Sequence, residues 1–271
     1  MIEPKYIAHF TQFDTLMKYI IPESKLKLGS MVNSNDSIER RMNISFEVDV
    51  IPKDEILQRK VIESIKMICF KYSLKSDINS VFTDLVYKSC SMWSHYANFS
   101  SGVCIIFNKE KVENQIKNQA IQHGATFISS QIIQYYSHQD VGDYNKKLKL
   151  LKPCYEGKYS CVKDYLNNDE NMSIVKTAMF IKSYGWQHEK EFRIAVSSEA
   201  DFYIKIDLAD CIEGIILGLN CKATDEEIRK ISILNGITVY RHLYQAEHAK
   251  DFFYKYDENT QPILISTGHD L

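Results

Sequence analysis

Short apolar runs and helical stripes alternate along the chain. Residues 102–107, GVCIIF, form an apolar, β-branched run between turn residues, which is typical of a buried strand. Residues 53–65 carry apolar side chains at helical spacing after two acidic residues, which predicts a helix. The same reasoning predicts strands at residues 6–11, 25–30, 67–72, 192–196, 202–206, 212–217 and 237–240, a strand or hairpin at 125–136, and helices at 14–21, 109–122 and 224–234.

Strands and helices alternate in order only near the C-terminal end. The fold class predicted is therefore α+β, with a mixed or antiparallel central sheet, or sheets, flanked by helices. Neither an internal repeat nor a flexible linker interrupts the chain, so we expect a single domain over residues 1–271. The sequence pattern predicts a mostly helical insertion at residues 141–184, broken near 167–171. It also predicts a loosely held tail from about residue 257.

Composition narrows the class of protein. The 33 basic and 35 acidic residues give a net charge of −2, which argues against a broadly basic nucleic-acid-binding surface but leaves room for a local basic groove. No apolar run approaches the roughly 18 residues of a membrane span, and the first residues lack a signal-peptide pattern, so we expect a cytoplasmic protein without a membrane partner. The seven cysteines are irregularly spaced without a CxxC pair, as expected of buried thiols.

Three segments place polar and aromatic residues where a core has no need of them. The first is Ala8-His9-Phe10-Thr11, at the end of a predicted strand and just before a helix. Sites are often built at strand ends, so His9 and Thr11 are candidate binding residues. The alternative is a histidine that caps the next helix or fills a half-buried position.

The second segment, MWSHYA at residues 92–97, holds an indole, a hydroxyl, an imidazole and a phenol. Trp93 and Tyr96 could stack on a planar ring, and His95 could hold or move a proton near neutral pH. The alternative is an aromatic-rich helix end packed into the core.

The third segment is WQHEKEFRI at residues 186–194. If it is a strand, Glu189, Glu191 and Arg193 share one face, because residues two apart point the same way. One carboxylate could then be ionised beside the guanidinium while the other has a raised pKa. The alternative is a solvated edge strand with a weak surface pair.

Several catalytic motifs are missing from the chain. Neither the Walker lysine motif nor GxGxxG, GxSxG or HExxH occurs, so the enzyme classes that depend on them lose support.

Taken in order, these segments resemble the bacterial domain-of-unknown-function family 2971. The resemblance runs from about residue 6 to 240 through YIAHFT, LMKYI, KLKLGSMVNSNDSIE, MWSHYANFSSGVCIIF, KSYGWQHEKEFRI and CIEGIILGLNC. The family pattern implies a polar loop that holds Asn35, Asp36 and Glu39. Here the loop departs from the pattern, with Ser37 in place of the family's proline and Ile38 in place of its phenylalanine.

A more distant resemblance suggests a chemistry. A strand histidine, a middle Ser/Tyr motif and a late strand glutamate occur in the order that is similar to ADP-ribosyltransferases, including bacterial toxins. By that resemblance His9 would hold NAD, Tyr96 would stack on nicotinamide and Glu191 would be catalytic. Glu189 would form a Glu-x-Glu pair with it, and Thr11 and Ser94 would be secondary ligands.

The expected activity is therefore NAD cleavage by a toxin-like effector of bacterial anti-phage defence, with NAD as substrate and no metal. The partners expected are a small nucleotide and a protein or nucleic-acid acceptor, while the oligomeric state is open. The residues expected near one cleft are Asn35, Asp36, Glu39, His95, Tyr96, Glu191 and Arg193.

Two other functions fit the same residues. The first is a binding module for a nucleotide or a protein, which would use the same cluster without turnover. The second is a nuclease, in which Asp36, Glu39, Glu189 and Glu191 would hold Mg²⁺.

Overall fold

The computed structural model describes residues 3–33, 53–75, 81, 84–85, 89–136, 159–199, 203–245, 250–256 and 262–267. Its contacts divide the chain into two compact units, each assembled from separate segments. Unit 1 comprises Met1–Leu26, Phe70–Gln115 and Asp207–Leu271, and unit 2 comprises Lys27–Cys69 and Ile116–Ile206. The expected single domain stays a prediction, because compactness alone does not tell whether either unit folds separately.

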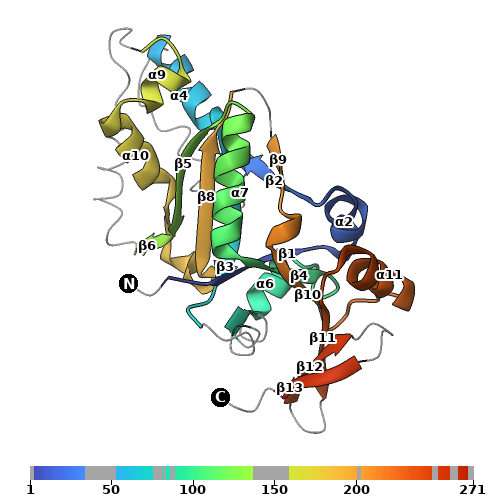
Figure 1. The fold of residues 1–271 in the computed structure, drawn as a ribbon. Coiled ribbons are helices and arrows are strands. Elements are labelled where there is room, and N and C mark those ends of the chain that lie inside the picture. Colours follow the sequence, from blue (N-terminus) through green and yellow to red (C-terminus); the bar gives the residue numbers. More distant parts are fainter. Residues whose placement is uncertain are drawn as a thin grey trace. The chain divides into compact units, whose positions relative to one another are not determined.

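The sheet of unit 1 has the strand order β13-β12-β11-β10-β4-β1 (Figure 1). Its neighbouring strands are antiparallel except for β10 and β11, which are parallel. The last residues of β3 pair with β1, with Tyr72 opposite Ile7. The strands are β1 (Tyr6–Thr11), β3 (Ile65–Tyr72), β4 (Val103–Asn108), β10 (Ile212–Leu217), β11 (Val239–Gln245), β12 (Lys250–Tyr256) and β13 (Pro262–Thr267).

Strand β4 lies inside this sheet, because it pairs with β1 on one side and β10 on the other. Its residues Val103–Phe107 are all buried. One core cluster of unit 1 packs Trp93, Phe10, Cys104 and Ile216 together. The helical elements of this unit are α1 (Phe13–Thr15), η1 (Leu16–Ile20), α2 (Ile21–Glu23), α6 (Cys90–His95), η6 (Ala209–Cys211), α11 (Asp225–Arg229) and η7 (Lys230–Leu234).

Unit 2 contains β5 antiparallel to β8, while β8 also pairs with β3, and β2 lies between β3 and β9. A separate two-stranded parallel sheet joins β6 to β7. The strands are β2 (Lys25–Ser30), β5 (Thr126–Ile132), β6 (Gln134–Tyr136), β7 (Ile181–Ser183), β8 (Glu191–Ser197) and β9 (Tyr203–Asp207).

Helices α4, α9 and α10 contribute much of the second core (Figure 1). Tyr165, Val175, Met179 and Ala195 are among its buried residues. Asn168 caps α10 by accepting a hydrogen bond from the Asn171 N–H at 3.0 Å, which explains the break between the two helices. The helical elements are η2 (Met31–Asn33), α4 (Lys53–Ser64), α9 (Val162–Leu166), α10 (Asp169–Met179) and η5 (Tyr184–Glu189), and α7 (Lys109–Gln122) begins in unit 1 and ends in unit 2.

These elements confirm the α+β expectation of a mostly antiparallel arrangement of strands flanked by helices. A capping box begins helix α11, with both reciprocal hydrogen bonds between Thr224 and Glu227 formed. The described helices of the expected insertion are α9 and α10, and residues 137–158 lie outside the described residues.

The C-terminal region differs from expectation. Strand β13 lies in the segment for which we expected a loose tail, and it pairs antiparallel with β12. Residues 237–240 are followed by two more strands instead of ending the sheet. The expectation of a loose tail was wrong because β12 and β13, with the sequences KDFFYKY and PILIST, carry the aromatic and β-branched residues that are typical of strands.

Candidate functional site

A cluster of four charged side chains lies buried in unit 2. Lys182 and Arg193 carry two positive charges, and Glu189 and Glu191 carry two negative ones. None of these four side chains is more than 6% exposed. Buried charges are expensive to desolvate unless each is paired and hydrogen-bonded, so this cluster depends on its mutual contacts.

Lys182 joins the two carboxylates. Its Nζ donates to Oε2 of Glu189 at 2.6 Å and to Oε2 of Glu191 at 3.1 Å. The same ammonium lies 4.8 Å from the centre of the Trp186 ring, within the range of a cation–π interaction. One cation therefore connects strand β7, the 3₁₀-helix η5 and strand β8.

Arg193 holds the other side of Glu191. Its Nε donates to Oε1 of Glu191 at 2.7 Å, and its Nη1 donates to the carbonyl of Met179 at 2.6 Å. The strand alternation explains this pair, because Glu191 and Arg193 are two residues apart on β8 and share one face. Both oxygens of Glu191 therefore accept a hydrogen bond from a cation.

This environment keeps Glu191 ionised. Burial raises the pKa of its carboxyl, but the charges of Arg193 and Lys182 and the hydrogen bonds from Arg193 and Cys69 outweigh burial and lower the pKa to about 2. The expected ionised carboxylate beside the guanidinium is therefore present.

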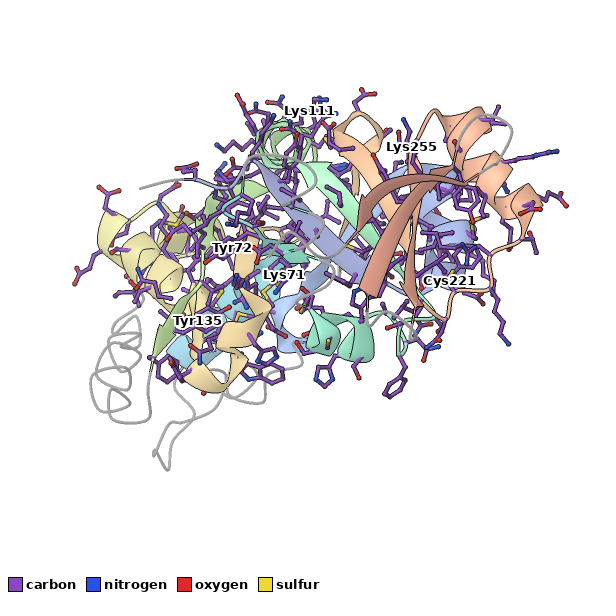
Figure 2. The ribbon with its side chains drawn as sticks, turned by 90° about the horizontal axis from the view of Figure 1, so that it is seen from below. Lys71, Tyr72, Lys111, Tyr135, Cys221 and Lys255 are labelled. Carbon is purple, nitrogen blue, oxygen red and sulfur yellow. The ribbon has the colours of Figure 1, made fainter. Side chains whose placement is uncertain are left out.

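Two further residues surround Glu191. The hydroxyl of Tyr135, a residue labelled in Figure 2, accepts a hydrogen bond from the Glu191 backbone N–H at 2.9 Å, and burial raises the pKa of this phenol. Tyr135 lies opposite Lys182 in the parallel pairing of β6 and β7, so one small sheet brings both to the carboxylate. Burial, followed by the negative charge of Glu191, raises the pKa of the Cys69 thiol.

The geometry corrects two expectations about this segment. Glu189 is not on the strand: it ends η5, and Lys190 has a left-handed backbone (φ 45°) before β8 begins at Glu191. The strand-face argument therefore holds for Glu191 and Arg193 alone, and Glu189 reaches them through Lys182. The surface-pair alternative is wrong, because the groups are buried.

The MWSHYA segment belongs to unit 1 and divides between core and surface. Trp93 is 4% exposed and packs edge-to-face on Phe10, with ring centres 5.1 Å apart. Its expected role as an open stacking platform is therefore wrong, because the core occupies its ring. His95 is exposed at the end of α6, and its ring lies 6.4 Å from that of the half-buried Tyr96, while Ser94 is also half-buried.

A left-handed turn follows this segment. Asn98, Phe99 and Ser100 have φ values of 46°, 54° and 64°. The left-handed conformation costs about 1–2 kcal/mol for each residue that carries a Cβ, so the surroundings must hold the turn in place. Asn220 does this from the loop after β10, since its Nδ2 donates to the Phe99 carbonyl and its N–H to the Ser100 carbonyl, both at 2.9 Å.

His9 and Thr11 also lie in unit 1, on β1. The half-buried His9 ring packs edge-to-face with Phe70 at 6.0 Å, and Thr11 lies opposite Val103 at the end of the strand. The expected single cleft stays a prediction, because the structure places its residues in separate units and Asn35, Asp36 and Glu39 lie outside the described residues.

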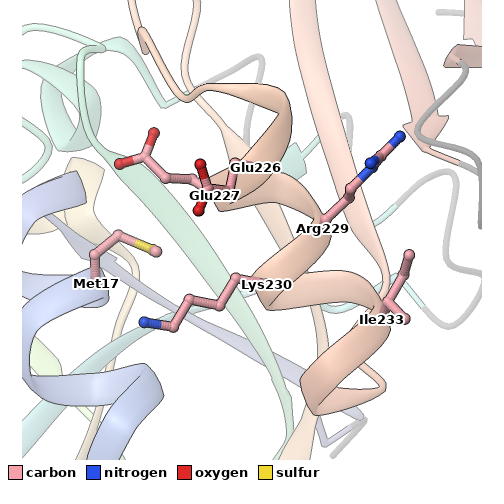
Figure 3. A pocket seen from close by; sticks show the side chains of 6 residues that line it. All are labelled: Met17, Glu226, Glu227, Arg229, Lys230 and Ile233. Atoms are coloured by element: carbon pink, nitrogen blue, oxygen red, sulfur yellow. The ribbon is translucent and has the colours of Figure 1, made fainter.

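A pocket of about 540 Å³ lies in unit 1, and none of the described candidate site residues is among those that line it (Figure 3). Met17 lines it from η1, opposite side chains from α11 and η7. Both η1 and η7 are π-helical. The lining residues are Met17, Glu226, Glu227, Arg229, Lys230 and Ile233.

The residues that the structure describes offer no candidate metal site. Within them, no three His, Cys, Asp or Glu side chains are grouped so that they could hold an ion. Among the same residues, no helix has the length and apolar character that crossing a membrane requires.

One family model matches part of the chain. Residues 92–194 match the family model described as "Protein of unknown function (DUF2971)". The match begins at Met92, the first residue of MWSHYA, and ends at Ile194, the last residue of WQHEKEFRI, so it supports the DUF2971 resemblance over both motifs. It leaves the rest of the expected span, residues 6–240, without a match. No curated protein and no solved structure matches the chain.

The sequence reasoning assigned no role to Lys182, Tyr135 or Cys69. Lys182 had one signal, a lone lysine directly after the apolar Phe180 and Ile181. No sequence signal distinguished Tyr135 or Cys69, because each lies in an ordinary aromatic or apolar strand pattern. Their position beside Glu191 follows from strand pairing between distant segments.

Proposed function

We propose that this protein binds NAD and cleaves its nicotinamide–ribose bond, in the manner of an ADP-ribosyltransferase. The observation that carries the proposal is the Glu191 carboxylate, which Arg193 and Lys182 keep ionised in a water-poor setting. A bond cleavage that develops positive charge on the ribose needs a fixed negative group of this kind.

The proposed reaction breaks one bond and forms one. The bond between the nicotinamide nitrogen and the ribose carbon breaks, and its electron pair leaves with nicotinamide. Water, or a hydroxyl, amino or carboxylate group of an acceptor, then bonds to the ribose carbon and, where it carries one, gives up a proton. Glu191 stabilises the positive charge in between, and neither a metal nor an oxidant takes part.

The ADP-ribosyltransferase resemblance supplies the roles of the other candidate residues in this proposal. His9, Thr11, Ser94 and Tyr96 would bind NAD, with Tyr96 on the nicotinamide ring, and His95 would act in catalysis. A toxin-like role in cytoplasmic defence against phage belongs to the same proposal, with a protein or a nucleic acid as acceptor.

A second candidate function is a binding module without turnover. It is favoured by the complete mutual pairing of the four buried charges, which is also the arrangement of a purely structural network. For a nuclease, Glu189 and Glu191 would have to exchange their cationic partners for a metal ion.

The test compares the wild type, Glu191→Gln and Glu170→Gln with NAD labelled in the adenosine part. Glu170 is an exposed residue of α10 and serves as the matched control. We expect Glu191→Gln to release nicotinamide at least about 100-fold more slowly than the wild type, as when one charge-stabilising group is removed, and Glu170→Gln to equal the wild type. Label transferred to protein or nucleic acid would identify the acceptor.

Circular dichroism must show that each variant is folded. A folded Glu191→Gln protein with wild-type release would overturn the proposal. So would the absence of nicotinamide release from the folded wild type.

A further inference from the structure

The segment η5, Tyr184–Glu189, connects β7 to β8 and lies mostly at the surface. Tyr184 is 54% exposed, and Gly185, Gln187 and His188 are also exposed. Glu189 is the buried side chain of this segment, at 3% exposure. A surface segment that buries one carboxylate at its end is anchored through that charge.

The anchor is Lys182. Its ammonium binds Glu189 at 2.6 Å and lies under the Trp186 ring at 4.8 Å, so two side chains of η5 converge on it. The same ammonium binds Glu191 at 3.1 Å. Glu189 and Glu191 are therefore neighbours around one cation, and the end of η5 lies directly against the carboxylate of Glu191.

The ends of η5 favour movement as a unit. Lys190, between η5 and β8, is exposed and has a left-handed backbone, which an L residue adopts at a cost. At Gly185, near the start of the segment, a Cβ would meet only the Ser183 hydroxyl oxygen, at 4.0 Å, so there is open space beside the backbone at this position. Rotation at these positions would release η5 without disturbing the ladder of β8.

We propose that η5 is a cover over Glu191, closed by the ion pair between Lys182 and Glu189. Opening breaks this ion pair and removes Trp186 from the ammonium, while Arg193 keeps its bond to Glu191. The inference rests on the proposed function in one respect: a substrate can reach Glu191, now 3% exposed, only when a cover of this kind opens.

Cys69 offers a direct readout of opening. Cys69 is half-buried in the closed structure, and its thiol forms a hydrogen bond with Glu191, so it lies beside the group that η5 is proposed to cover. Cys104 is fully buried in the core of unit 1 and reports unfolding instead. The alkylation rates of both thiols can be measured in one sample by mass spectrometry after exposure to iodoacetamide.

The experiment uses the full chain as wild type, Glu189→Gln and Gln187→Ala. Glutamine removes the charge that closes the cover, and Gln187 is an exposed neighbour on the same segment. We expect alkylation of Cys69 to be at least tenfold faster in Glu189→Gln, with Cys104 unchanged, and Gln187→Ala to match the wild type. Hydrogen exchange at residues 184–190 should rise in parallel.

An unchanged Cys69 rate in Glu189→Gln, or equal acceleration of Cys69 and Cys104, would overturn the cover. The two proposals fail separately. Faster Cys69 alkylation in Glu189→Gln, together with no nicotinamide release from the wild type, would keep the cover and refute NAD cleavage, whereas nicotinamide release from the wild type with an unchanged Cys69 rate in Glu189→Gln would refute only the cover.

Discussion

The two motifs at the ends of the family match are built by different physics. WQHEKEFRI in unit 2 depends on buried charges, since each of its two carboxylates and its guanidinium has an ionic partner within 3.1 Å. MWSHYA in unit 1 depends on packing and backbone hydrogen bonds, with Trp93 against Phe10 and the next turn held by Asn220. Polar letters in a motif are therefore not a guide to exposure, because Glu189, Glu191 and Arg193 are buried.

The contrast predicts different sensitivities to substitution. Removing the partner of a buried charge lowers the free energy of unfolding more than a packing defect does, because water cannot solvate the charge that remains. A packed turn should fail through steric overlap, whatever the pH.

The largest effect is expected from Arg193→Met. It leaves the buried Glu191 with Lys182 alone and should lower the free energy of unfolding by about 3–5 kcal/mol, measured by urea denaturation. The double variant Arg193→Met/Glu191→Gln removes both partners, leaves Lys182 with Glu189, and should lose less than the single variant. A single-variant loss under about 1 kcal/mol would show that the pair contributes as little as a surface pair.

The next largest effect is expected from low pH, which should destabilise the charged motif but not the aromatic one. The pKa of Glu191 is about 2 in the folded chain against an ordinary value of 4.5, so the unfolded chain binds the proton more readily. The stabilisation from Glu191 is therefore complete above about pH 4.5 and is lost as the pH falls toward 2, by roughly 3 kcal/mol. Urea denaturation between pH 7 and pH 3 should give a flatter profile for Glu191→Gln than for the wild type; equal slopes would contradict the assignment.

The smallest effect of the three is expected in the aromatic motif, from Gly218→Ala. A Cβ at this position would overlap the Ser100 carbonyl oxygen and approach Cζ3 of Trp93 to 2.9 Å, so the left-handed turn must shift. We expect a loss of about 1–3 kcal/mol at every pH. Gly29→Ala is the matched control, because nothing lies within 4 Å of its Cβ position, and it should change stability by less than about 1 kcal/mol. Equal melting temperatures for the two variants would show that the turn yields freely.

Local pattern was sufficient for much of the fold. Strand β2 and helix α7 have the predicted bounds, and the capping box at Thr224 starts α11, because each depends on neighbours only a few residues away. The pairing of Glu191 with Arg193 followed from the alternation of a strand in the same way. The sequence did not predict the environment of the Trp93 ring, because a tryptophan at this helix end can equally stack on a ligand or pack on Phe10.

The amino-acid order therefore decided which residues carry charge and which segments are strands, since alternation and helical spacing are local properties. Folding in three dimensions decided what those charges meet. Lys182 arrives from β7, Tyr135 from β6 and Cys69 from β3, and Lys190 turns the chain so that Glu189 leaves the strand and binds the same ammonium as Glu191. These contacts join segments up to 122 residues apart (191 − 69), and no local pattern encodes them, because the low-dielectric interior that makes the pairing decisive exists only once the chain has folded.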